Sequence, residues 1–191
     1  MSNFFERFAF CYNIIPILLR IDYPLVEKEI DLRKGERVLD VGGGTGRLAK
    51  KIVDLFDVEL TILDTSASML KRVRKHPRIR IIRGSIENSY FQNNSFDVIL
   101  CVDTLHHLGN PERALKEMYR VLTPQGKIFI QDFDITKYRI KILKFVESYL
   151  LKEPGKFYSP QSLAKELEKI GFNGFIKFIR KIQYLYIGKK S

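Results

Sequence analysis

Four glycines lie where an apolar run gives way to a turn, in the stretch Val38-Leu-Asp-Val-Gly-Gly-Gly-Thr-Gly46, and three of them, Gly42, Gly44 and Gly46, occupy alternate positions. Glycine lets the backbone turn sharply and leaves room for a ligand, because it has no Cβ. A dinucleotide fingerprint would need a glycine at position 47, which is Arg47, and the Gly-Lys-Ser/Thr ending of a P-loop is also absent. The loop therefore predicts a ligand site of another kind.

An acidic residue, Asp64, follows the next apolar run and lies 18 residues after Gly46. A carboxylate at the end of a second strand can accept hydrogen bonds from both hydroxyls of a ribose. Taken singly, the two features are also typical of a tight strand–helix turn and of a surface aspartate. Together, at this spacing, they predict a nucleoside-binding site.

The elements that must position these residues alternate along the chain. The expected strands are 37–41, 60–63, 79–82, 96–102 and 127–133, with a turn at 124–126 before the last of them. The expected helices are 45–56, 66–76, 111–122, 136–152 and 159–170. Strands 175–181 and 183–187 are close enough to form an antiparallel hairpin. This order predicts an α/β fold, a parallel sheet with helices on both faces.

The composition excludes several classes of protein. The 191 residues are 45% hydrophobic, which excludes a disordered chain and suits one domain. Cys11 and Cys101 lie far apart, which excludes a disulfide scaffold or a cysteine-based zinc site and fits a cytoplasmic location. We expect no membrane span and no signal peptide, because the apolar stretch from Phe8 to Leu19 is too short and Glu6 precedes it.

The motifs, taken in order, resemble those of class I S-adenosylmethionine-dependent methyltransferases. The pattern is most similar to the small-molecule group that includes the ubiquinone/menaquinone-type C-methyltransferases. The matching motifs are Leu39–Gly46, Asp64–Leu70, Gly84–Glu87, Ser95–Leu100, Leu105–Leu108 and Leu115–Gly126. The resemblance implies a Rossmann-like three-layer sandwich whose seven-stranded, mostly parallel sheet has the order 3-2-1-4-5-7-6, with strand 7 antiparallel.

The resemblance also implies cofactor contacts. The methionine part of S-adenosylmethionine would be surrounded by Asp40, Gly42, Gly43, Gly44 and Gly46, and the ribose would be held by Asp64. The adenine would be flanked by Thr65 and Met69 and edged by Ser85 and Ile86, while the backbone carbonyl of Cys101 would accept from the amino group. Ser85 departs from the family pattern, which often has aspartate there, so Glu87 is an additional candidate.

Methyl transfer from a sulfonium needs a base only when the acceptor must lose a proton. The candidates for this base are His106, His107 and Asp132, which follow the fourth strand or end the fifth, with Asp103 a weaker one. The alternative is that the His-His pair simply packs near the cofactor. We expect a small organic acceptor and no metal.

We expect residues 1–191 to form a single methyltransferase domain. It has an N-terminal helical cap (1–30), a cofactor-binding core (36–133) and C-terminal helices with a β-hairpin (134–191). The formal charge is +11, and residues 134–191, with 13 basic and 5 acidic side chains, carry +8 of it. Basic residues also cluster without acids from Lys71 to Arg83. Such surfaces suit solubility, nucleic acid or an anionic membrane surface. The alternatives are an RNA or protein methyltransferase and a noncatalytic cofactor-binding partner subunit; the oligomeric state is not predicted.

Overall fold

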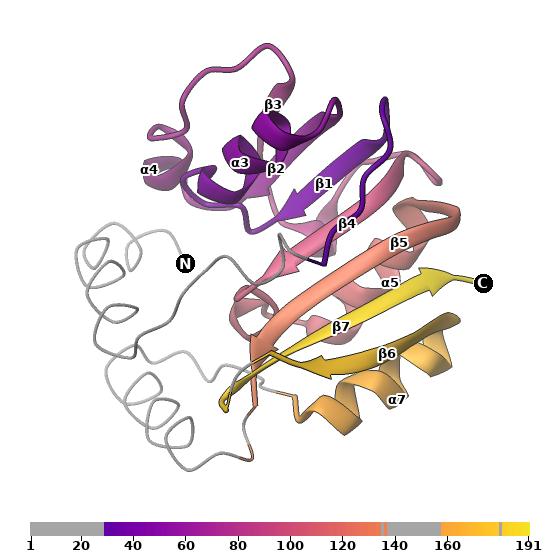
Figure 1. Cartoon of the computed structure of the whole chain (residues 1–191). Coiled ribbons are helices and arrows are strands. Elements are labelled where there is room, and N and C mark those ends of the chain that lie inside the picture. The colour runs from indigo at the N-terminus through magenta and orange to yellow at the C-terminus, as the bar shows by residue number, and fades with distance from the viewer. Residues whose placement is uncertain (1–28, 135, 137–157, 180) are drawn as a thin grey trace.

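The computed structural model describes residues 29–134, 136, 158–179 and 181–191. Seven strands form one sheet in the order β3-β2-β1-β4-β5-β7-β6 (Figure 1). The strands are β1 (Arg37–Val41), β2 (Glu59–Asp64), β3 (Ile79–Arg83), β4 (Phe96–Val102), β5 (Leu122–Phe133), β6 (Phe172–Phe178) and β7 (Gln183–Lys190). Strands β1 to β5 pair in parallel, and β7 lies antiparallel between β5 and β6. The predicted strand order is confirmed.

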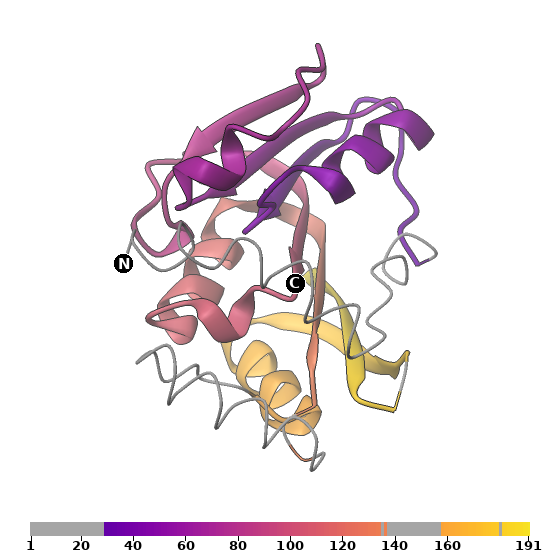
Figure 2. The same ribbon diagram turned by 90° about the vertical axis from the view of Figure 1, so that its left-hand side faces the viewer.

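Helices cover both faces of this sheet (Figure 2). On one face, α3 (Arg47–Leu55) and α4 (Ala67–Leu70) pack on alternate side chains of β1, β2 and β4. On the other face, α5 (Pro111–Val121) and α7 (Pro160–Ile170) pack on the side chains between them. Successive strand residues point to opposite faces, so a strand buried on both sides must be apolar throughout. Strand β4 has five buried residues in seven and is apolar except for Asp97 near its start, which is half-buried and pairs with Arg37.

The helix ends follow local sequence signals. The side chain of Asn110 accepts a hydrogen bond from the Arg113 amide at the start of α5, and Ser159 does the same for the Ser162 amide at the start of α7. Helix α7 ends at Gly171, which has a φ of 113° that suits glycine. These helices match the predicted ranges closely because both caps and breakers are encoded in a few adjacent residues.

Two local predictions were wrong. The helix expected over 66–76 ends at Leu70, giving only one turn. Four cations crowd positions 71 to 75 around one valine, and like charges at i and i+4, such as Lys71 and Lys75, disfavour a helix. The turn expected at 124–126 lies within the longer strand β5, where the register against β4 shifts and Gln125 has a φ of 62°.

The expected cap (1–30) and the expected helix over 136–152 lie almost wholly outside the described residues. None of the helices in the described ranges has the length and apolar character needed to cross a membrane.

Candidate functional site

The glycine loop leaves β1 and enters α3 through three left-handed residues. Gly42, Gly44 and Gly46 have φ values of 71°, 53° and 71°, which side chains other than glycine rarely adopt. A Cβ on Gly42 would lie 2.2 Å from Thr104 Cγ2, and one on Gly46 would lie 2.9 Å from Val73 Cγ1. A Cβ on Gly44 would meet nothing nearer than 3.9 Å. Gly42 and Gly46 are therefore needed for internal packing, whereas Gly44 borders the open space that a ligand can enter.

The carboxylate of Asp64 is fixed at the end of β2. Its Oδ2 accepts from the Gly44 amide at 2.9 Å, and its Oδ1 accepts from the Ser66 amide at 2.8 Å. Each carboxylate oxygen can accept a second hydrogen bond. The loop and the acid predicted from the sequence are thus in direct contact, and the carboxylate is held in one orientation beside the loop.

A second acid, Asp40, lies beneath the loop. It is 2% exposed, and its Oδ2 has no hydrogen-bond partner in the described chain. Burial, and then the charge of Asp64, raise the pKa of Asp40 to about 7. A Cβ on Gly43 would lie 2.5 Å from this oxygen, so only glycine fits above it. A buried carboxyl without a partner suits a cationic ligand such as a sulfonium with its ammonium group, so the residues present fit S-adenosylmethionine.

Two of the residues predicted for the adenine, Ser85 and Ile86, lie at the start of the 3-10 turn η2 (Ile86–Asn88), whereas Thr65 follows β2 and Met69 lies in α4. Ser85 Oγ donates to Glu87 Oε2 at 2.8 Å and accepts from the Glu87 amide at 3.3 Å. Glu87 Oε1 in turn accepts from the Asn110 amide. Ser85 therefore acts with Glu87 as a unit, and Ile86 is buried. Across the loop, Met69 Cε would be 3.9 Å from a Cβ on Gly44.

The sheet divides at Cys101. Pairing of β4 with β1 ends at Val41 and Cys101, whereas pairing with β5 continues to Val102 and Gln131. Strand order reverses between β1 and β4, and ligands of open α/β sheets bind at such a point. Cys101 lies at this division with a buried side chain, and burial raises the pKa of its thiol well above the usual range. The predicted role of its carbonyl remains a prediction.

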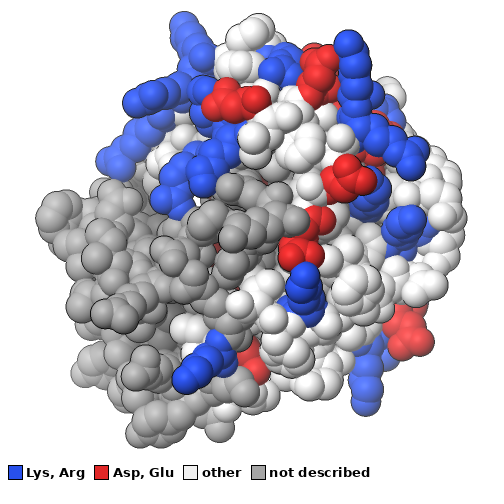
Figure 3. Space-filling view, in the orientation of Figure 1, with Lys and Arg blue, Asp and Glu red and all other residues white. Residues whose placement is uncertain are grey.

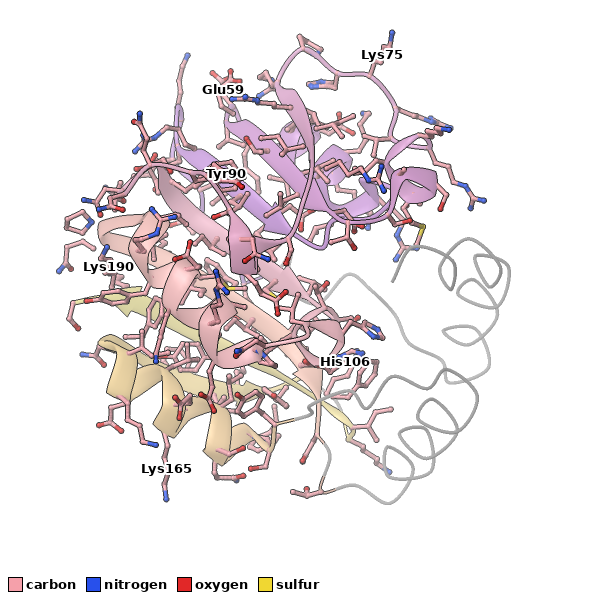
Figure 4. The ribbon with its side chains drawn as sticks, turned by 180° about the vertical axis from the view of Figure 1, so that it is seen from behind. Glu59, Lys75, Tyr90, His106, Lys165 and Lys190 are labelled. Atoms are coloured by element: carbon pink, nitrogen blue, oxygen red, sulfur yellow. The ribbon has the colours of Figure 1, made fainter. Side chains whose placement is uncertain are left out.

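The two groups predicted as base candidates at the ends of β4 and β5 meet. His106, in the 3-10 turn η3 (Leu105–His107), lies with its Nδ1 2.6 Å from Asp132 Oδ1. Asp132 Oδ1 also accepts from the Phe133 amide at 2.7 Å. Both His106 and Asp132 are buried. Figure 4 shows His106 at the edge of the sheet where the parallel strands end, opposite Lys190.

The neighbouring His107 has a different environment. Its ring lies tilted at 48° against that of His106, with centroids 4.0 Å apart. Removal from water, and then the charge of His106, lower the pKa of His107 well below the usual histidine value. His106 therefore has the orienting carboxylate that a base requires, and His107 packs against it.

Three residues near these groups were missed by sequence reasoning. Thr104 Oγ1 donates to the Val102 carbonyl at 2.9 Å, and its methyl group faces Gly42. Gln131 and Gln183 are fully buried at the ends of β5 and β7. The sequence signal for the glutamines was a polar residue inside an apolar strand, which becomes informative only with the strand register.

The cations of the basic run, residues 71 to 83, lie in two kinds of environment. Arg78 caps the end of α3, because its guanidinium donates to the Phe56 carbonyl at 2.7 Å and to Asp57 at 3.2 Å. Exposed cations of the run form no ion pair within the described ranges; they are Lys71, Arg72, Arg74, Lys75 and Arg80. Figure 3 shows Lys and Arg side chains gathered at the upper left, over the region of α3 and α4. Arg78 of the predicted basic patch thus has a structural role at the end of α3, and the exposed cations remain available at the surface.

A sheet of this order, with a glycine loop after β1 and an acid ending β2, defines the class I methyltransferase fold. Residues 39–130 match a methyltransferase domain family. An S-adenosylmethionine-dependent methyltransferase of Thermotoga maritima superposes with a TM-score of 0.80 over 100% of both chains, at 23% identity.

Two curated relatives are more similar in sequence. The ubiquinone/menaquinone biosynthesis C-methyltransferase UbiE of Psychromonas ingrahamii is 32% identical over 179 residues, which cover 85% of this chain and 71% of the relative. The demethylmenaquinone methyltransferase of Paenarthrobacter aurescens is 36% identical over 139 residues, which cover 70% and 54%. The chain therefore belongs to the ubiquinone/menaquinone C-methyltransferase family, whose cofactor is S-adenosylmethionine. It spans less than two thirds of the length of several relatives.

Proposed function

We propose that the protein transfers the methyl group of S-adenosylmethionine to a small organic acceptor bound beside His106 and Asp132. The observation that carries this proposal is the buried hydrogen bond of 2.6 Å between these two side chains, at the strand ends that border the glycine loop. The names of the relatives support an acceptor of the reduced demethylmenaquinone type, methylated at carbon.

Each half of the site has its own task in this proposal. When bound, S-adenosylmethionine supplies an electrophilic methyl group and a neutral thioether leaving group. The carboxylate of Asp64 accepts from the ribose hydroxyls, and Asp40 lies against the cationic part. Gly44 lets the ligand approach the loop, while Ser85 with Glu87 and Ile86 border the adenine. The protein mainly positions the two reactants and excludes water.

The histidine provides acid–base chemistry. Asp132 holds the proton of His106 on Nδ1, so the lone pair is on Nε2. Nε2 would take the proton of an acceptor hydroxyl, which makes the ring carbon next to that hydroxyl more nucleophilic, and Asp132 would then stabilise the imidazolium. The ring carbon would accept the methyl group as the bond from methyl to the departing thioether breaks. Loss of the ring carbon's own proton to solvent, and return of the Nε2 proton to the oxygen, would restore the aromatic ring and its hydroxyl. This division of labour resembles the orienting role of a carboxylate beside a catalytic histidine in general.

The test combines cofactor binding with methyl transfer. Titration calorimetry measures S-adenosylmethionine binding to the wild-type chain and to the variants His106→Gln and His76→Gln. Transfer of a tritiated methyl group to reduced demethylmenaquinone is measured in parallel. We expect binding in all three proteins, transfer by wild type and His76→Gln, and loss of about 10²–10⁴-fold in rate in His106→Gln.

Three outcomes would contradict the proposal. Absence of cofactor binding at millimolar concentration would overturn the cofactor site. Cofactor binding without transfer to the quinol or to a panel of small phenols would instead favour a noncatalytic partner subunit. Unchanged turnover in His106→Gln would remove the assigned role of the histidine.

A further inference from the structure

Two glutamines are buried without the hydrogen bonds that their amides need. Gln131 and Gln183 are 0% and 1% exposed. Within the described chain, Gln183 Nε2 and Oε1 and Gln131 Oε1 have no hydrogen-bond partner within 3.5 Å. Most buried polar side chains are hydrogen-bonded, because an unpaired buried amide is unfavourable. Two such residues together indicate a place where another molecule completes the hydrogen bonds.

The strand register brings both glutamines to one face. Phe133 of β5 is directly opposite Gln183 of β7, and Gln131 is opposite Leu185. Paired residues point to the same face, and so do residues two apart in one strand. Gln131 and Gln183 therefore share a face with the apolar side chains of Phe133 and Leu185. Asp132 lies between them in β5 and points to the opposite face, toward His106.

The carboxyl group of Asp103 adjoins this pair. Gln131 Nε2 lies 3.5 Å from Asp103 Oδ1, and the Asp103 amide donates to the Gln131 carbonyl at 2.9 Å. Its other oxygen, Oδ2, is buried without a partner in the described chain. Asp103 has a φ of 50°, an unfavourable conformation for a residue with a side chain, and such strain is common at functional sites.

Asp103 also connects the glutamines to the proposed base. Burial, and then the charge of Asp132, raise the pKa of Asp103 to about 7, while the charge of His106 and the side-chain amides of Gln131 and Gln183 oppose this shift. The three groups are therefore close enough to interact. Near neutral pH the Asp103 carboxyl can serve as a donor or as an acceptor of a hydrogen bond.

We propose that Asp103, Gln131 and Gln183 form a binding subsite for a neutral hydroxyl group on an apolar part of the methyl acceptor. An amide offers both a donor and an acceptor, and a hydroxyl group needs both. A cationic amine has donors only, so it could not accept from the amide N–H groups of Gln131 or Gln183. The apolar neighbours Phe133 and Leu185 suit an apolar ring or chain that carries the hydroxyl.

This inference rests on the proposed function, since it describes how the acceptor is held. Its consequence is selectivity: the subsite would bind a molecule with the hydroxyl and reject the same molecule without its donor. A site built to hydrogen-bond a hydroxyl discriminates strongly, because the buried protein groups are otherwise left unpaired. These residues would thus determine specificity, and His106 would perform the chemistry.

The experiment compares two probes that differ in one hydrogen-bond donor. Titration calorimetry measures binding of 1-naphthol and 1-methoxynaphthalene to the protein saturated with S-adenosylhomocysteine. We expect 1-naphthol to bind about tenfold more tightly to wild type. Gln183→Leu and Gln131→Leu should abolish this preference and leave the affinity for S-adenosylhomocysteine unchanged. Gln161→Leu, the same change at an exposed position of α7, should preserve the preference.

Equal affinity of the two probes for wild type, or no binding of either, would overturn the subsite, and so would a preference that survives in both variants. The wild-type comparison decides even if a variant fails to fold. Methyl transfer to reduced demethylmenaquinone separates the two proposals. Transfer without naphthol preference rejects only the subsite, and naphthol preference without transfer rejects only the proposed function.

Discussion

The two halves of the candidate site are built in different ways. The cofactor half, around β1 and β2, consists of a glycine loop and two acids within residues 40–64, and the key contact is between the Gly44 amide and Asp64. The acceptor half, around β4, β5 and β7, consists of side chains with buried polar atoms from segments as far apart as Asp103 and Gln183. The first half depends mainly on backbone shape, and the second on side-chain chemistry. Changes of cofactor affinity and changes of turnover should therefore separate.

The largest effect should come from the acceptor half. Asp132→Asn removes the negative charge that orients and stabilises His106 and nearly preserves side-chain shape. We expect the turnover number to fall about a thousandfold, and the dissociation constant for S-adenosylmethionine to stay within twofold of wild type. Single-turnover kinetics and calorimetry check these values. A parallel loss of cofactor affinity would mean that the halves are not separable.

The second prediction concerns Asp64 in the cofactor half. Asp64→Ala removes both the ribose acceptor and the fixed contact to the Gly44 amide. We expect the affinity for S-adenosylmethionine to fall about 100-fold, because hydrogen bonds to charged groups are each worth about 1.5–3 kcal/mol. Asp54→Ala, an exposed change on α3, is the matched control. Affinity within threefold of the control value would exclude Asp64 as the ribose ligand.

A third prediction sharpens the comparison through pH. The pKa of Asp40 is raised to about 7 from an ordinary value of 3.8, so the folded protein holds a proton that the unfolded chain releases. The free energy of unfolding should therefore decrease as the pH rises from about 4 to 7, and Asp40→Asn should reduce this decrease. Asp103, raised to about 7 as well, contributes with the same sign.

Asp40 and Asp103 should differ in their effect on the affinity for S-adenosylmethionine. Ionised Asp40 attracts a cation, so the affinity for S-adenosylmethionine should increase about tenfold between pH 5.5 and 7. This increase should disappear in Asp40→Asn and persist in Asp103→Asn. Calorimetry over this pH range is the measurement. If the pH dependence disappeared in Asp103→Asn and persisted in Asp40→Asn, the cationic part of the cofactor would lie against Asp103, in the acceptor half, and the prediction would be wrong.

The smallest effect is expected at Thr104, which joins the two halves. Thr104→Val keeps the methyl group against Gly42 but removes the hydrogen bond from Oγ1 to the Val102 carbonyl. We expect a loss of about 1 kcal/mol in the free energy of unfolding. Thermal unfolding should report a midpoint lower by about 2–4 °C. A change within 0.5 °C would show that packing alone holds the two loops together.

The sequence predicted the cofactor half better than the acceptor half, for a physical reason. Gly42, Gly44 and Gly46 form one contiguous motif, and parallel strands end at the same edge, so Asp64 follows from chain order. The same rule brought His106 and Asp132 into one region. It did not reveal Gln183, because its position depends on the register of an antiparallel pair that the apolar pattern leaves open.

The predictions that were wrong or incomplete also have physical causes. Ser66 as an N-cap and Pro77 as a stop predicted a helix over 66–76, but it ends at Leu70, where the crowded cations begin. Arg78 appeared in a basic run with no acids, and its role as a cap for α3 depends on carbonyl groups that are 22 to 25 residues earlier. Local patterns therefore predicted elements, and long-range contacts decided how individual charges are used.

The antiparallel position of β7 has a consequence for synthesis of the chain. Of the described elements, β7 is made last, yet it inserts between β5 and β6 and brings Gln183 beside Asp103. Ribosomes extend the chain from the amino end, so β1, β2 and the glycine loop emerge well before this strand. The residues of the glycine loop are thus synthesised before the strand that would complete the proposed acceptor subsite. Selectivity for the acceptor would then be the last property that the described part of the chain acquires.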